Sequence, residues 1–151
     1  MLLTDLLTPE RVRVPIAAPD KRGVVAELAA MIAPAGSEAY GALLQAVEER
    51  EAVLSTGIGF GVAIPHGRAA AIAELAVVGG VTASPVAFDA IDGEPVRLVF
   101  LIVGPDAAAG QHVKVLGRIA RLVRHADTRA ALLSATTPEA FCAALADAEA
   151  S

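Results

Sequence analysis

The sequence contains no tryptophan, and aromatic residues make up only 3% of it. A ligand-binding surface of stacked aromatic side chains is therefore not expected. The single cysteine, Cys142, cannot form an internal disulfide, so the cysteine content gives no indication of an oxidising compartment. Because Cys142 falls on the apolar face of the last expected helix, we interpret it as an unreactive core residue.

The chain also lacks a long apolar run. Charged residues interrupt it throughout, and no segment approaches the roughly 18 apolar residues that a membrane-spanning helix requires. The first residues lack the charged leader and apolar core of a signal peptide. Twelve basic and 17 acidic residues give a net charge of −5, which argues against a nucleic-acid partner. We expect one cytoplasmic domain over residues 1–151, without direct membrane insertion.

The order of apolar segments predicts mixed α/β structure. Residues 96–103 are apolar at nearly every position, which is typical of a central strand. Gly79-Gly80 indicates a bulge or close packing, and Asp92-Gly93 indicates a hairpin turn. We expect strands over residues 62–64, 75–83 and 96–103, and helices over residues 20–33, from Ser37 to Arg50, over 111–125, from a cap at Asp127 to Leu133, and from Thr137 onward. The predicted fold is a small mixed β-sheet sandwiched between helices.

The segment Ser55–Arg68, with the sequence STGIGFGVAIPHGR, is the most informative part of the chain. Pro65 restricts the backbone on one side of His66, and Gly67 leaves the other side uncrowded. A histidine displayed in this way suits a nucleophile or a ligand better than a packing residue. An incidental histidine at the end of a loop is the alternative, and the residue types leave it open.

Other motifs give less support to a function. The Gly57–Gly61 loop enters a strand, whereas a dinucleotide-binding loop leaves a strand and opens a helix. The sequence has no HExxH or CxxC pattern and no clear third ligand for zinc. It also has no GxSxG nucleophile elbow, which argues against a hydrolase triad that uses Ser55. We therefore expect neither a metal nor a cofactor.

Two further histidines follow the expected central strand. His112 falls at the start of a helix, where anions and ligands gather in α/β proteins. A solvated residue at a helix start is its alternative interpretation. His125 falls near the end of the same helix, and we expect it to interact with the terminal carbonyls and the helix dipole.

Several segments resemble the signature of EIIA type-2 domains, the fructose/mannitol and nitrogen-regulatory phosphocarriers of the bacterial phosphoenolpyruvate-dependent phosphotransferase system. The central match comprises Arg50-Glu51, residues 55–59 and residues 63–67. Further matches follow in order at residues 6–10, 88–92, 95–96, 112–113 and 116. The resemblance extends over almost the whole chain, and it implies a mixed sheet between helices.

By this resemblance, His66 is the residue that accepts a phosphoryl group from HPr or from its nitrogen-branch paralogue. His112 is expected to stabilise the phosphate, and Arg50 to contact the phosphate or a partner. A solvated cation at a helix end is the alternative interpretation of Arg50. The expected phosphate-binding residues are Ser55, Thr56, Gly57, Gly59 and Gly67.

Two functions follow from the resemblance. In the first, the domain passes phosphate from His66 to a cysteine of an EIIB domain during sugar uptake. In the second, it is a stand-alone nitrogen-type regulator whose phosphorylation state controls its binding to a regulatory protein. The sequence names neither the sugar nor the regulator.

Overall fold

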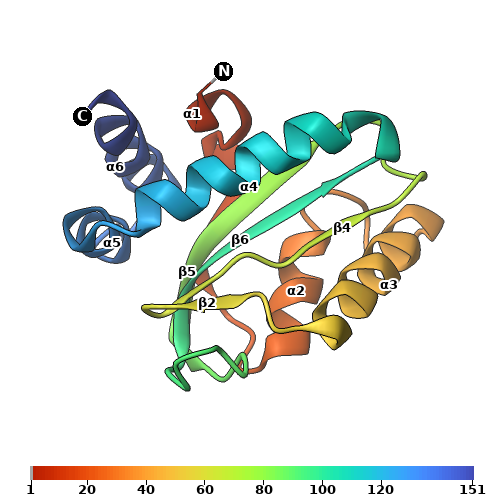
Figure 1. Cartoon of the computed structure of the whole chain (residues 1–151), viewed down its shortest axis with the longest axis horizontal. Coiled ribbons are helices and arrows are strands. Elements are labelled where there is room, and N and C mark those ends of the chain that lie inside the picture. Colours follow the sequence, from red (N-terminus) through yellow and green to blue (C-terminus); the bar gives the residue numbers. More distant parts are fainter. Residues whose placement is uncertain (1) are drawn as a thin grey trace.

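The structure, a computed structural model, describes residues 2–151 and contains a mixed six-stranded sheet (Figure 1). The strand order is β1-β5-β6-β3-β2, and β4 also pairs with β6. The strands are β1 Val12–Ile16, β2 Gly57–Gly59, β3 Val62–Ala63, β4 His66–Arg68, β5 Ala76–Val86 and β6 Val96–Gly104. The helices are α1 Leu3–Leu6, α2 Lys21–Ala29, α3 Glu38–Val53, α4 Ala109–Val123, α5 Ala126–Leu133 and α6 Pro138–Ala150, with short 3-10 helices at Pro9–Arg11 and Asp106–Ala108.

Strand β6 is the central strand, as its composition predicts. It pairs antiparallel with β5 on one side and parallel with β3 and β4 on the other. Its side chains alternate between two cores: Leu98, Phe100 and Ile102 face one, and Val99, Leu101 and Val103 face the other. Since both faces of this strand are covered, apolar residues occur at nearly every position.

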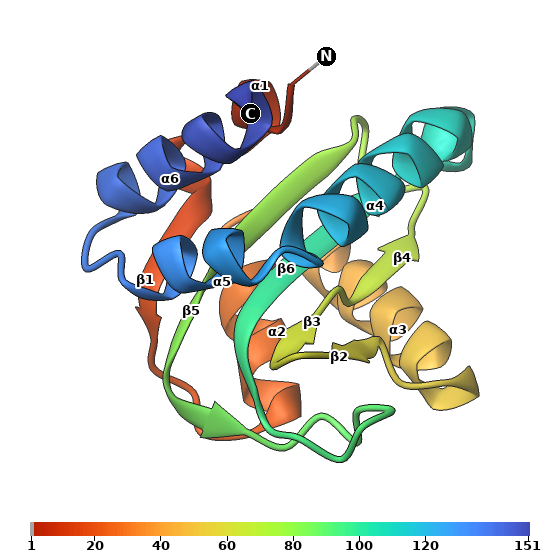
Figure 2. The same cartoon turned by 60° about the vertical axis from the view of Figure 1, so that its left-hand side comes forward.

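Helices cover both faces of the sheet (Figure 2). The first core joins the sheet to α1, α4, α5 and α6, through residues such as Val115, Ile119 and Phe141. The second joins it to α2 and α3, through residues such as Leu28 and Leu43. The predicted sandwich of a mixed sheet between helices is confirmed.

Three helix starts match the sequence pattern. The side chains of Asp20, Ser37 and Thr137 each accept a hydrogen bond from the backbone N–H three residues later, which caps α2, α3 and α6. The expected cap at Asp127 is wrong. His125 occupies the N-cap position of α5, and Asp127 lies inside the first helical turn, where its charge favours the helix dipole.

The expected role of His125 at the end of α4 is taken by another residue. Arg129 Nη1 donates to the carbonyl oxygens of Val123 and Arg124, both at 2.9 Å. His125 is exposed and lies between α4 and α5. A basic side chain does satisfy the terminal carbonyls, but it comes from the following helix.

Several boundaries differ from the expected ones. Helix α2 ends at Ala29 instead of residue 33, and β5 continues to Val86 instead of residue 83. Strands β1, β2 and β4 and the short helix α1 were not predicted. Asp92-Gly93 lies in a nine-residue connection, residues 87–95, between β5 and β6, so it is not a two-residue hairpin. Gly93 adopts a φ of +73°, which glycine accommodates readily.

None of the helices described over residues 2–151 is long and apolar enough to cross a membrane. Cys142 is partly buried against the first core, and its thiol lies 3.2 Å from the carbonyl oxygen of Leu7. Burial raises the pKa of Cys142, together with the charges of Glu139 and Glu10. A raised pKa reduces the thiolate fraction, in agreement with an unreactive cysteine.

Gly80 explains the pair of glycines in β5. It lies beside Arg13 in the parallel β1–β5 ladder, and a Cβ built at residue 80 would lie 2.0 Å from the carbonyl oxygen of Arg13. Only glycine lets the two backbones approach this closely. The expected close packing is confirmed at this position.

Replacing Gly80 with alanine should lower the free energy of unfolding by about 3 kcal/mol, because the new methyl group overlaps backbone that is fixed in the sheet. Gly41→Ala is the control, because Gly41 lies in α3 and a Cβ added there has no neighbour within 4 Å apart from the adjacent backbone of its own helix. This variant should gain up to about 1 kcal/mol. Urea unfolding measures both, and equal stability of the two variants would contradict this account of Gly80.

Candidate functional site

His66 and His112 lie in one pocket of about 580 Å³, where α3, β4 and α4 meet. Helix α3 contributes Arg50, and β4 contributes Gly67 and Arg68 to its lining. Three of the predicted residues that are far apart in sequence, Arg50, His66 and His112, are therefore brought together.

Strand β4 holds His66 in the pocket. It runs parallel to β6, with His66 opposite Ile102. A Cβ at Gly67 would lie 3.0 Å from backbone atoms of Ala46 and Val47, so the glycine allows β4 to pack directly against α3. The Pro-His-Gly sequence thus places a histidine between a helix and the central strand.

The ring of His66 has a defined protonation pattern when it is neutral. Its Nδ1 lies 2.9 Å from the backbone carbonyl oxygen of Ile64. A carbonyl oxygen only accepts hydrogen bonds, so Nδ1 must carry the proton and donate it. The lone pair of the neutral imidazole then resides on Nε2, which is the nitrogen able to act as a nucleophile.

His112 is buried beside this ring, with only 4% of its surface exposed. The two ring centroids lie 5.5 Å apart, and the planes cross at 70°, an edge-to-face arrangement. Among residues 2–151, His112 Nδ1 has no hydrogen-bond partner. A buried polar nitrogen without a partner is costly, and such a cost is typical of functional sites.

Both histidines are held neutral. Burial, followed by the charges of His66 and Arg68, lowers the pKa of His112 to about 4. Burial also lowers the pKa of His66, and Arg50 and Arg68 contribute in the same direction. The hydrogen bond to Ile64 and the charge of Glu51 partly oppose this decrease. At neutral pH, His66 therefore offers a lone pair instead of a positive charge.

Two arginines give the pocket its positive charge. The guanidinium of Arg50 donates from Nη1 to the carbonyl oxygen of Leu54 at 2.8 Å, which fixes the side chain at the end of α3. Arg68 follows His66 by two residues on β4 and lines the same pocket. The site therefore combines a neutral imidazole with two arginines, of which Arg50 is held by a hydrogen bond.

Ser55, Thr56 and Gly57 do not line this pocket. The Ser55 hydroxyl donates to the carbonyl oxygen of Phe88 at 2.5 Å, and Gly57 N–H donates to Ser55 Oγ at 3.0 Å. The Thr56 N–H and hydroxyl both donate to the carboxylate of Glu51. Each of these donors is therefore already used by an acceptor within the protein.

Gly59 is also absent from the pocket lining, whereas Gly67 belongs to it. Gly59 has a φ of +94°, and a Cβ there would lie 3.2 Å from Asp92 Oδ2. The neighbouring carboxylate makes Gly59 an unfavourable place for an anion. Among residues 2–151, no group of three or more His, Cys, Asp or Glu residues could hold a metal ion.

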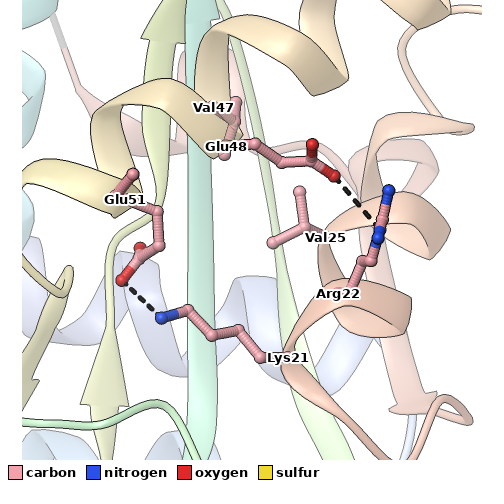
Figure 3. Close-up of a pocket in the computed structure, with 7 residues that line it drawn as sticks. Lys21, Arg22, Val25, Val47, Glu48 and Glu51 are labelled. Atoms are coloured by element: carbon pink, nitrogen blue, oxygen red, sulfur yellow. Dashed lines mark ion pairs between the residues drawn. The ribbon is translucent and has the colours of Figure 1, made fainter.

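Two residues in or next to the site were given no role in the sequence analysis. Arg68 is one, although it lies at the end of the conspicuous 55–68 segment. Glu51 is the other: it pairs with Lys21 at 2.8 Å across α2 and α3 (Figure 3). The position of Glu51 beside Arg50 in the matched motif could have indicated a role. Its contacts with Lys21 and Thr56, however, are visible only in the tertiary structure.

The sequence matches the model of the family described as "Phosphoenolpyruvate-dependent sugar phosphotransferase system, EIIA 2" over residues 5–148. The chain belongs to this EIIA type-2 family. This result confirms the resemblance drawn from the motif of residues 50–67, and it supports a role as a component of a phosphotransferase system.

Relatives of this EIIA domain include both regulatory and transport proteins. It is 34% identical to a nitrogen regulatory protein of Bradyrhizobium diazoefficiens, over 97% of this chain and 95% of the relative. It is 33% identical to the fructose-specific EIIABC component of Bacillus subtilis, over 93% of this chain but 22% of that longer protein. The crystal structure of nitrogen regulatory protein IIA-Ntr from Neisseria meningitidis superposes with a TM-score of 0.87 and 30% identity, covering 95% and 98% of the two chains.

The depressed pKa of His112 predicts a loss of stability in acid. The folded-state pKa is about 4 and the reference value is 6.5, so the unfolded state binds more protons between these values. Stability falls as the pH decreases through this interval. The unfolding free energy of the unmodified protein should fall between about pH 7 and about pH 4.5. In the His112→Gln variant, this fall should be smaller by about 2 kcal/mol.

Urea unfolding at the two pH values measures this difference. The control is His125→Gln, at an exposed position outside the pocket. It should keep the pH dependence of the unmodified protein. An identical pH dependence of the His112 variant and the unmodified protein would show that the pKa of this imidazole is not depressed in the folded state.

Proposed function

We propose that this EIIA domain is a phosphohistidine carrier that accepts a phosphoryl group on Nε2 of His66. The observation that carries the proposal is the bond from His66 Nδ1 to the carbonyl of Ile64, which leaves the lone pair on Nε2. The lowered pKa of the imidazole supports it, because a protonated ring has no lone pair to offer.

The transfer is an in-line exchange between two nitrogen atoms. The Nε2 lone pair attacks phosphorus, a new N–P bond forms, and the N–P bond of the donor phosphohistidine breaks. The electron pair of that bond returns to the donor nitrogen. His66 keeps its proton on Nδ1 throughout, so both ring nitrogens are substituted after the transfer, and the ring carries a formal positive charge beside the doubly negative phosphoryl group. Both positions are imidazoles, and the protein mainly orients the groups and stabilises their charge.

The surroundings of His66 suit the phosphate that would be attached to it. Arg50 and Arg68 supply positive charge on two sides of the pocket. His112 is neutral and buried beside the ring, so an N–H of its imidazole could donate to a phosphate oxygen without adding charge. Gly67 lines the pocket and lets α3 pack close to the acceptor. We assign phosphate stabilisation to His112 and Arg50, and add Arg68 to the set.

The proposed partners are those that membership in the EIIA type-2 family implies. The donor is the phosphohistidine of HPr or of its nitrogen-branch paralogue, and the exchange takes place in the cytoplasm. In the transport function, the acceptor is the cysteine of an EIIB domain. The name of the Bacillus relative, EIIABC component, joins an EIIA part to EIIB and EIIC parts and supports such an acceptor.

A regulatory function is the second candidate. The relative from Bradyrhizobium is named a nitrogen regulatory protein, and it matches this chain over nearly the full length of both proteins. In this function, the phosphate on His66 changes the charge and shape of the pocket surface, and thereby the affinity for a regulatory protein. Transfer of phosphate to a purified EIIB domain supports transport. A lack of transfer, together with binding of a regulator in one phosphorylation state only, supports regulation.

His66→Ala should abolish uptake of acid-labile phosphate from phosphoenolpyruvate in the presence of enzyme I and HPr, because no other residue supplies the attacking nitrogen. His125→Ala is the matched control and should be labelled at the unmodified rate, since His125 lies outside the pocket. Labelling of the His66 variant at the unmodified level would disprove the assignment of the acceptor.

His112→Ala should still accept phosphate on His66, but more slowly, and it should pass the phosphate on poorly. Loss of one donor to the transferring group is expected to slow the exchange by about a hundredfold. Single-turnover labelling and reverse transfer to HPr measure the two directions. Unchanged rates in both directions would exclude a catalytic role for His112.

A further inference from the structure

Two ion pairs connect α2 and α3 across one groove (Figure 3). Arg22 pairs with Glu48 at 3.3 Å, and Lys21 pairs with Glu51 at 2.8 Å. The two pairs differ in burial: the Glu48 side chain is 47% exposed, whereas that of Glu51 is 11% exposed. An exposed pair contributes little to stability, but a buried carboxylate needs partners for both oxygens.

Glu51 obtains these partners from Thr56. Its Oε2 accepts the Thr56 backbone N–H at 2.9 Å, and its Oε1 accepts the Thr56 hydroxyl in a very short contact. Burial acts to raise the pKa of Glu51, but the hydrogen bonds from Lys21 and Thr56 outweigh it, and the pKa is lowered. Glu51 is therefore ionised at neutral pH and holds Thr56 by two charge-assisted bonds.

The connections continue from Thr56 to the ring of His66. The Thr56 carbonyl oxygen accepts the Ile64 N–H at 2.9 Å. The Ile64 carbonyl oxygen in turn accepts the proton of His66 Nδ1, also at 2.9 Å. A continuous series of hydrogen bonds thus leads from the Glu51 carboxylate, through two residues, to the nitrogen that sets the tautomer of His66.

These intermediate residues have little freedom to adjust. Thr56 is 4% exposed and Ile64 is 1% exposed, and Ile64 lies in the first core. Pro65, which separates Ile64 from His66, has a restricted φ. A displacement of Thr56 would therefore be transmitted to the Ile64 carbonyl instead of being absorbed along the way.

From this geometry we infer that Glu51 is a positioning residue for His66. Glu51 fixes the orientation of the His66 ring and the tautomer that has its lone pair on Nε2. This inference rests on the proposed function of His66 as the phosphoryl acceptor. Glu51 does not itself line the pocket, so its effect on the transfer is exerted through Thr56 and Ile64.

Glu51→Gln tests the inference at nearly constant size. A glutamine replaces one of the two carboxylate oxygens with an NH₂ donor. It therefore cannot keep both present bonds, in which Oε2 accepts the Thr56 N–H and Oε1 accepts the Thr56 hydroxyl, and it no longer carries the negative charge that pairs with Lys21. Glu48→Gln is the matched control. It removes a carboxylate from the same helix and the same groove, but Glu48 has no bond to the loop that begins at Ser55.

Nitrogen NMR of protein with isotopically labelled histidine measures the tautomer of His66 without any phosphate. Glu51→Gln should decrease the fraction with the proton on Nδ1, whereas Glu48→Gln should retain it. Phosphorylation by phospho-HPr should slow by about tenfold to a hundredfold in Glu51→Gln, mainly in the maximal rate. Glu48→Gln should retain the unmodified rate.

An unchanged tautomer population and an unchanged rate in folded Glu51→Gln would overturn the inference. If that variant does not fold, Thr56→Val and Thr56→Ser replace it. Valine removes the hydroxyl and should shift the tautomer and slow the transfer, and serine keeps the hydroxyl and should restore both. Equal behaviour of these two variants would also overturn the inference.

Failure of the proposed function gives a different result. In that case, the unmodified protein itself is not labelled on His66, while the tautomer comparison remains measurable. Labelling of His66 that is insensitive to Glu51 and Thr56 instead refutes only the positioning role.

Discussion

The properties of the site depend on one hydrogen bond, from His66 Nδ1 to the carbonyl oxygen of Ile64. It selects a tautomer, orients the ring, and leaves Nε2 as the nucleophilic nitrogen. Burial and the neighbouring Arg50 and Arg68 lower the pKa of the same imidazole, so the lone pair is available at neutral pH. Under the proposed function, these features prepare the ring for attack on phosphorus.

The fold provides the rigid frame that this bond requires. Strand β6 is buried on both faces and pairs with β3 and β4, so Ile64 and His66 are held next to the central strand of the sheet. Helix α4 brings His112 to the pocket from one layer, and α3 brings Arg50 from the other. Residues from both layers therefore meet at the edge of the sheet where β4 ends.

Much of the fold and part of the site could be predicted from the sequence, because their signals are local. The apolar run of β6 and the caps at Asp20, Ser37 and Thr137 are examples. Strands β2, β3 and β4 are only two or three residues long, and they form because they pair with neighbouring strands of the sheet. Of these three, only β3 was predicted from the sequence. Ser55 and Thr56 looked like phosphate ligands, but their donors are used by Phe88 and Glu51, partners that only the tertiary structure reveals.

The central claim is that His66 carries phosphate on Nε2 while Nδ1 keeps its proton. The most direct test is NMR of the phosphorylated protein with isotopically labelled histidine, which identifies the ring nitrogen coupled to phosphorus. The account predicts coupling to Nε2 of His66 and a proton on Nδ1. Phosphorus bonded to Nδ1 of His66, or to any other residue, would contradict it.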